Sequence, residues 1–138
     1  TGQTVGVILV GGLLGANRGA ISILCYILEG VSGFPVFAQM NAGIHVLIGP
    51  TGGYLWGFVI AAFLIGYLSE NGFTSKPFLC FLSCLLATIL ILVIGTIYLA
   101  AYKVGLNKAL VMGFYPFLIG GVVKSILCTI ILINLRKF

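Results

Sequence analysis

Apolar residues follow one another along this chain in long stretches that are separated by short polar or glycine-rich segments. The stretches 1–16, 20–31, 54–68, 78–101 and 117–135 predict five helices, with turns at 17–19 and 69–76. A helix needs about 20 residues to cross a bilayer, so 78–101 exceeds that length and 117–135 comes close to it, while the other three stretches are shorter. The pattern therefore predicts an all-α membrane protein, a polytopic bundle in which five transmembrane helices are present.

Composition supports the membrane assignment. Of the 138 residues, 61% are hydrophobic and 7% are charged, and the mean hydropathy is +1.26. Soluble domains carry about 25% charged residues, which excludes an ordinary soluble domain. The net charge of +5 is then read as a signal of membrane topology rather than of nucleic-acid binding.

The segment 49–53 holds three glycines and a proline, and the apolar stretch after it starts at Tyr54. Gly53, Gly57 and Ala61 are four residues apart, so they share one helix face on which a second helix can approach closely. Irregular backbone at membrane depth is tolerated only where protein buries it or where it lines a cavity. We therefore expect a polar site at the mouth of the bundle, faced by Tyr54, although tyrosine is also common at membrane interfaces.

The segment 35–51 before this turn contains no charged residue and is rich in apolar side chains. A solvated loop is usually more polar. The segment is expected either to lie on the membrane surface or to fold onto the bundle as a lid. Asn41 within it is a candidate polar lid residue, with the simpler alternative that it caps a turn.

Lys124 lies about two turns into the last predicted helix, if that helix starts near Pro116. A lysine at the bilayer centre costs about 2.5–3.5 kcal/mol on insertion scales, and such residues mark ligand or ion pathways. A rise of 1.5 Å per residue places it ~12 Å below the helix end. It can face a small carboxylate or phosphate ligand, lower its pKa and stay neutral, or snorkel to the headgroups.

The basic residues outside the spans predict the topology. Five spans place Arg18, Lys76, Arg136 and Lys137 on one side, and Lys103 and Lys108 on the other. Since basic residues concentrate in cytoplasmic loops, the C-terminus is expected in the cytoplasm and Thr1 outside. A start outside without a signal peptide predicts a preceding span, and hence six helices of which the first is absent.

Two kinds of chemistry find little support. The four cysteines, Cys25, Cys80, Cys84 and Cys128, lie in apolar stretches without a CxxC pair, which is more typical of small buried hydrophobes than of a metal or redox site. The chain also has no GxxxxGK[ST] loop, so any ATP hydrolysis is expected on partner subunits. The sequence does not predict an enzyme.

Several motifs together resemble one family. They are GPTGGYLWGF at 49–58, AAFLIG at 61–66, GQTVGVILVGGLLGANRGAIS at 2–22, GFPVFA at 33–38 and PFLIGGVVK at 116–124. In this order they are similar to the BioY family, the biotin-binding S components of energy-coupling-factor (ECF) transporters. The resemblance covers nearly the whole chain and implies six helices with both ends in the cytoplasm.

The resemblance implies that biotin binds near the external surface, under the loop before the GPTGGY turn. It assigns Tyr54 and Lys124 to the ligand site, with Asn41 as the match to a polar lid residue. Lys124 would serve the valerate carboxylate of biotin. The family usually has an acid three residues before the lysine, in a pattern like PFxxGDxxK, whereas this chain has Gly121, which removes one acceptor for the ureido N–H groups.

The sequence is therefore interpreted as a single transmembrane vitamin-binding domain over 1–138, N-terminally truncated, that captures biotin on the external side of a prokaryotic cell membrane. By resemblance, its partners are a transmembrane coupling subunit and cytoplasmic ATPases. Two alternatives stay open: a channel or independent secondary carrier for a small organic anion, and a non-transporting structural subunit or remnant. Uptake without ATPase partners favours the first alternative, and absence of ligand binding favours the second.

Overall fold

The computed structural model describes residues 3–37, 41–49, 52–101 and 105–135. Within them the chain forms helices and no strand. The helices are α1 (Gln3–Leu14), α2 (Ala16–Val31), α3 (Ile44–Ile48), α4 (Gly52–Glu70), α5 (Pro77–Leu99), α6 (Leu106–Gly113) and α7 (Tyr115–Leu135).

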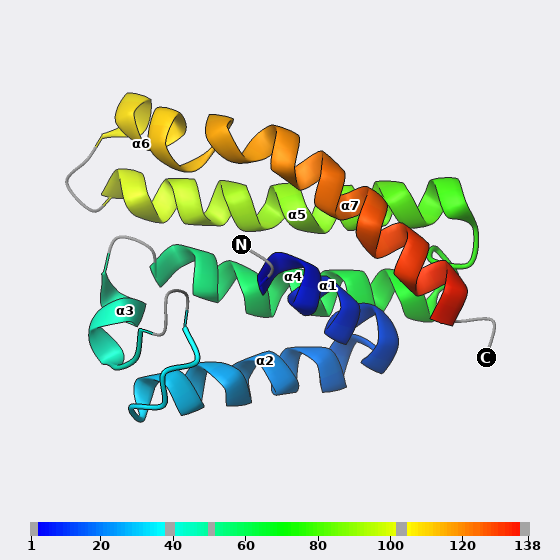
Figure 1. Ribbon diagram of the computed structural model, residues 1–138, viewed down its shortest axis with the longest axis horizontal. Coiled ribbons are helices and arrows are strands. Elements are labelled where there is room, and N and C mark those ends of the chain that lie inside the picture. Colours follow the sequence, from blue (N-terminus) through cyan, green and yellow to red (C-terminus); the bar gives the residue numbers. More distant parts are fainter. Residues whose placement is uncertain (1–2, 38–40, 50–51, 102–104, 136–138) are drawn as a thin grey trace.

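The long helices lie side by side along the long axis of the molecule (Figure 1). Helix α4 packs against α5, α2 lies along α4, and α7 lies along α5. The short α1 sits centrally, in contact with α2, α4 and α7. It begins near the middle of the long axis and runs towards the end at which α4 turns into α5 (Figure 1). The predicted all-α bundle is confirmed.

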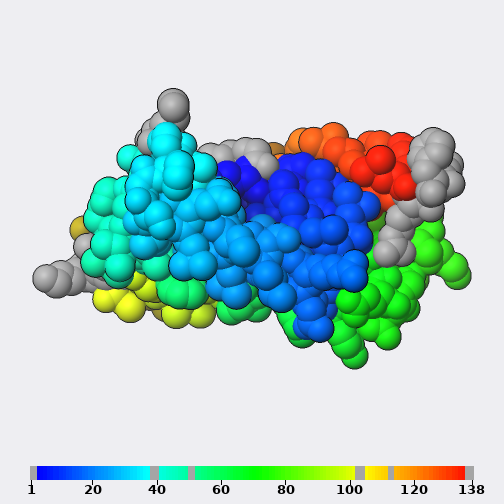
Figure 2. Space-filling view, turned by 90° about the horizontal axis from the view of Figure 1, so that it is seen from below, coloured from blue at the N-terminus to red at the C-terminus, as the bar shows by residue number. Residues whose placement is uncertain are grey.

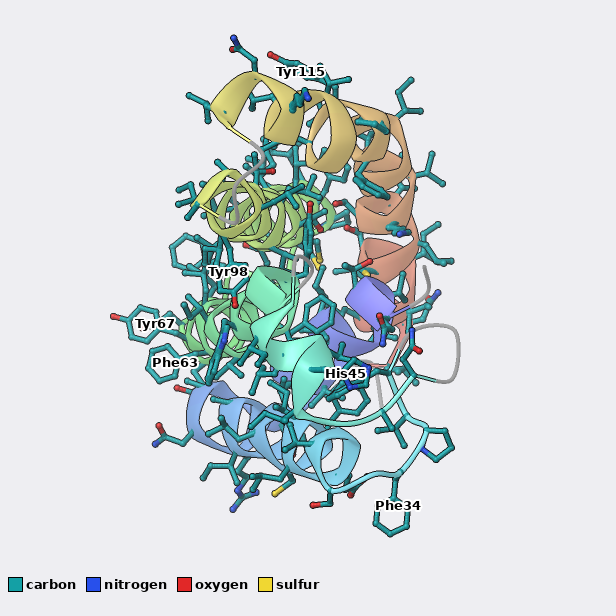
Figure 3. All side chains as sticks on the ribbon, turned by 90° about the vertical axis from the view of Figure 1, so that its left-hand side faces the viewer. Phe34, His45, Phe63, Tyr67, Tyr98 and Tyr115 are labelled. Atoms are coloured by element: carbon teal, nitrogen blue, oxygen red, sulfur yellow. The ribbon has the colours of Figure 1, made fainter. Side chains whose placement is uncertain are left out.

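Three segments have the length and apolar composition of membrane spans: α4, α5 and the region 106–135. Helix α1, with 12 residues, and α2, with 16, are shorter. Large apolar side chains point outwards all round the bundle, among them Phe34, Phe63 and Tyr67 in Figure 3. Lipid is the surroundings in which such side chains are stable, so the chain is a multi-pass membrane protein. The five-span count stays a prediction for α1 and α2.

The turn predicted at 17–19 is wrong, because these residues form the first turns of α2. The chain reverses before these residues, at Gly15, whose φ of 93° lies in the region that favours glycine. The Glu70 carboxylate accepts a hydrogen bond of 2.7 Å from the Ala16 N–H and so caps α2. Within α2, the absence of a side chain at Gly19 lets α1 pass close by, because a Cβ on it would lie 2.8 Å from Gly11 Cα.

Other predictions need smaller corrections. The segment 35–51 contains the short helix α3, and the connection between the predicted helices 78–101 and 117–135 contains the short helix α6. Cys80, Cys84 and Cys128 are fully buried as expected, but Cys25 is exposed on α2.

The small residues predicted to pack helices closely do so within the bundle. A Cβ on Gly53 would collide with Tyr98 of α5, and one on Gly57 would lie 3.2 Å from the Ile91 Cα. A Cβ on Gly11 would collide with the backbone of Ala62 in α4. Gly6 differs, because a Cβ there would meet nothing within 4 Å.

The described basic residues outside the long spans lie in two groups, one at each end of the bundle. Arg18 in α2 and the N-cap of α5, Lys76, lie at the end where α4 turns into α5, and Lys108 in α6 lies at the other end (Figure 1). This is the grouping that the five-span pattern predicts. Lys103, Arg136 and Lys137 lie outside the described residues.

Candidate functional site

A cavity of about 220 Å³ opens among five parts of the chain. Its walls come from the start of α1, the segment before and within α3, and the facing sides of α4, α5 and α7. The lining residues are Gln3, Thr4, Phe37, Val46, Tyr54, Leu55, Phe58, Thr88, Ile91, Leu92, Phe117, Gly121 and Lys124. Most of these side chains are apolar, so the few polar ones determine how a ligand is oriented.

Helix α1 contributes one wall of the cavity. Its residues Gln3 and Thr4 line the space and lie near the middle of the bundle. The described residues of the segment 35–51, which are 35–37 and 41–49, are called the lid from here. They lie at the end of the bundle beyond Gln3 and Thr4, and α3 is part of them (Figures 1 and 2). Phe37 and Val46 of the lid line the cavity.

The lid is anchored to the bundle at three points, which decides between the two predicted positions of this segment. The Tyr26 hydroxyl donates to the Val36 carbonyl at 2.7 Å, and the Tyr98 hydroxyl donates to the Leu47 carbonyl at 3.4 Å. The Phe37 ring is 3% exposed and lies directly on Gly30, where a Cβ would overlap it. The apolar segment therefore folds onto the bundle. His45 of α3 remains exposed at this end (Figure 3).

Tyr54 and Lys124, which lie 70 positions apart in the sequence, meet at the same cavity. The Tyr54 ring packs on Gly95 of α5, where a Cβ would collide with it, so the absence of a side chain makes room for the tyrosine. Lys124 is partly buried on α7. The structure thus brings together the two residues predicted from the turn and from the intramembrane lysine.

Asn41, the third predicted residue, is exposed and does not line the cavity. Its backbone carbonyl accepts a hydrogen bond of 3.1 Å from the Phe37 N–H, so the backbones of these two lid residues lie close together. A direct role in ligand binding stays a prediction for this residue.

Gly121 lines the cavity beside Thr88 of α5, and a Cβ on Gly121 would lie 3.1 Å from the Thr88 Cγ2 methyl. The Thr88 hydroxyl donates to the Cys84 carbonyl at 2.9 Å and lies 3.4 Å from the Ser125 hydroxyl. Ser125 in turn donates to the Gly121 carbonyl at 2.8 Å. This wall presents a methyl group and a glycine to the cavity, while both hydroxyl hydrogens are given to backbone carbonyls.

Sequence reasoning missed Gln3, Thr4 and Thr88 as cavity residues. Polar residues in an apolar stretch such as 1–16 usually hydrogen-bond between helices in lipid, and this is the role that the sequence predicts for Gln3 and Thr4. The available signal was that Gln3 is the one amide in the first apolar stretch before the turn. Its place at a cavity depends on where α1 begins relative to the lid, which only the tertiary structure shows.

The cavity has mostly apolar walls, and its polar lining groups are one amine, several hydroxyls and one amide. The amine suits an anionic group, and the amide and hydroxyls suit a polar group with hydrogen-bond donors and acceptors. Within the described residues, no group of three His, Cys, Asp or Glu side chains is placed to hold a metal ion. Fold and cavity are thus those of a membrane-embedded protein with room for a small organic molecule at one end of its helix bundle.

The chain belongs to the BioY family, whose model matches residues 1–138. It is 36% identical over 126 residues to the biotin transporter BioY of Thermotoga maritima, covering 91% of this chain and 73% of that protein. It is 39% identical over 130 residues to the biotin transporter BioY2 of Lactococcus lactis, covering 93% and 70%.

A solved structure agrees with these relatives. The crystal structure of the S component for biotin from an ECF-type ABC transporter superposes with a TM-score of 0.86 at 31% sequence identity. The match covers 99% of this chain and 74% of that one. The shared fold thus extends over essentially all of the chain.

Proposed function

We propose that this chain is the substrate-binding membrane subunit of a biotin uptake transporter of the ECF type. The observation that carries the proposal is the single cavity that Lys124 and Tyr54 share, in a chain whose relatives are biotin transporters. It is a transport protein rather than an enzyme. The domain 1–138 supplies the binding site.

In this proposal the valerate carboxylate of biotin lies at the Lys124 amine. Taking the carboxylate out of water is costly unless a cation meets it, and Lys124 is the cation that lines the cavity. The aliphatic chain and the thiophane ring of biotin then lie against Leu55, Phe58 and Ile91. The ureido group is left to the remaining polar residues.

We place the lid at the external surface and the C-terminus in the cytoplasm. Arg18 and Lys76 lie at the end of the bundle opposite the lid, and basic residues favour the cytoplasmic side. The cell membrane of a prokaryote is the location that this function requires. Biotin then enters from outside, under the lid.

Transport against a gradient requires energy that this subunit does not supply. We assign the hydrolysis of ATP to cytoplasmic ATPase subunits and its coupling to a transmembrane partner. The surface of α1 at Gly6 has room for a neighbouring helix, because a Cβ at Gly6 would meet nothing within 4 Å. It is a candidate part of the surface on which the coupling subunit docks.

The test is binding of radiolabelled biotin to the full-length protein purified in detergent, followed by uptake into liposomes. Saturable binding and uptake that requires the ATPase partners are the expected results. Uptake by the protein alone would contradict the subunit assignment and favour an independent carrier. Absence of binding by folded protein would contradict the biotin assignment.

A further inference from the structure

The ureido ring of biotin carries two N–H groups, and burying them without acceptors would cost affinity. This inference rests on the proposed function and concerns which residue accepts from them. The wall formed by Gly121 and Thr88 is a poor candidate, since Gly121 has no side chain and the Thr88 methyl faces it. The Lys124 amine when charged has only donors.

Gln3 is the lining residue with a side-chain carbonyl oxygen. Its amide nitrogen donates to the Tyr26 hydroxyl at 2.6 Å, and that hydroxyl donates to the Val36 carbonyl of the lid at 2.7 Å. A hydroxyl has one hydrogen, so once Tyr26 gives it to Val36 it can only accept from Gln3. The lid thereby fixes the amide with its nitrogen towards Tyr26.

The Gln3 carbonyl oxygen, Oε1, then faces away from Tyr26, and among the described residues it makes no hydrogen bond. The Tyr26 ring is itself held by an edge-to-face contact with Phe37, at 5.7 Å between ring centroids. Phe37 lines the cavity and is part of the lid. One chain of contacts therefore joins the lid backbone to an acceptor at the cavity wall.

We propose that Gln3 accepts a hydrogen bond from a ureido N–H of the ligand, and that Tyr26 is the positioning residue that orients Gln3 when the lid is closed. If the lid opens, Val36 leaves and the Tyr26 hydroxyl hydrogen becomes free to bond Gln3 Oε1. The amide then turns its donors to the cavity, where they cannot serve an N–H group. Recognition of the ureido group is in this way linked to closure of the lid.

The test compares biotin with two isosteric analogues in which oxygen replaces one or the other ureido N–H. The wild-type protein should prefer biotin over one of these analogues by about 10-fold, the value of one hydrogen bond of ~1.4 kcal/mol. Gln3→Met keeps the length of the side chain and removes the acceptor. It should lose most of that preference, whereas Gln3→Glu, which retains acceptor oxygens, should keep it.

Tyr26→Phe retains the ring contact with Phe37 and removes the hydroxyl that orients Gln3. It should reduce the preference on its own and have no further effect in the Gln3→Met background. Tyr98→Phe is the matched control, because it removes the other tyrosine hydroxyl that bonds the lid, and Tyr98 does not line the cavity. The Tyr98→Phe variant should prefer biotin over the analogue by the same factor as the wild-type protein.

An undiminished preference in Gln3→Met overturns the role of Gln3. Equal losses of preference in Tyr26→Phe and Tyr98→Phe overturn the positioning role, because lid anchoring alone would then explain both. Failure of the folded wild-type protein to bind biotin is a different result, since it overturns the proposed function and this inference with it.

Discussion

Polar groups are hydrogen-bonded within the protein at one end of the bundle and line a cavity at the other. At the corner between α1 and α2, the Glu70 carboxylate accepts from Ala16 and the Ser69 hydroxyl donates to the Gly12 carbonyl at 2.8 Å. Thr74 completes this cluster by donating to Ser69 at 3.1 Å. At the lid end, Lys124 and Gln3 line a cavity instead.

The glycines at the two ends also have different neighbours. Gly66 at the corner lets two backbones touch, because a Cβ there would overlap Gly15 and Ala16. Gly95 makes room for the Tyr54 ring, and Gly121 lines the cavity beside the Thr88 methyl group. The corner is therefore built for stability and the lid end for binding. Substitutions at the two ends should separate these two properties.

The largest effect on stability is expected for Gly66→Val at the corner. Its side chain would meet backbone atoms of Gly15 and Ala16, which cannot turn aside as a flexible side chain can. Overpacking costs about 1–3 kcal/mol and occasionally more, and this site should lie at the upper end. Denaturant unfolding in detergent measures the loss, and biotin affinity of the remaining folded protein should be unchanged.

Gly120→Val is the control, since a Cβ at Gly120 would meet nothing within 4 Å. Equal losses of stability for the two valine variants would mean that close backbone packing at the corner is not what stabilises it.

At the lid end, Gly95→Ala should weaken biotin binding by about 10-fold, a loss of ~1.4 kcal/mol. The added methyl group displaces the Tyr54 ring from its place against α5 and so moves it within the cavity. Equilibrium binding measures the change. Wild-type affinity in this variant would show that the position of Tyr54 does not matter to the ligand.

The smallest effect is expected for Glu70→Ala, which leaves the Ala16 N–H at the start of α2 without its acceptor. Loss of a helix N-cap typically costs about 1 kcal/mol, and binding should not change. Glu70→Gln keeps an acceptor oxygen and should lose less stability. If Glu70→Ala alters biotin affinity instead, the two ends are coupled and the division between them does not hold.

The sequence predicted the helical membrane bundle and two cavity residues, because those features depend on local signals. Long apolar stretches indicate spans, a lysine within one of them is rare, and a tyrosine directly after three glycines marks a special joint. The reversal at Gly15 escaped prediction because Glu70, 54 positions beyond Ala16, holds it in place. Gln3 escaped for the same kind of reason, since its partners are Tyr26 and the lid backbone.

The central claim is that the cavity at the lid end recognises the carboxylate of biotin through Lys124. The most direct measurement is equilibrium binding of biotin and of its uncharged carboxamide to wild-type protein and to Lys124→Met. We expect Lys124→Met to weaken biotin binding by at least about 30-fold, since losing one partner of a buried charge pair costs about 2–5 kcal/mol. The carboxamide should bind both proteins alike. Wild-type biotin affinity in folded Lys124→Met would contradict the claim.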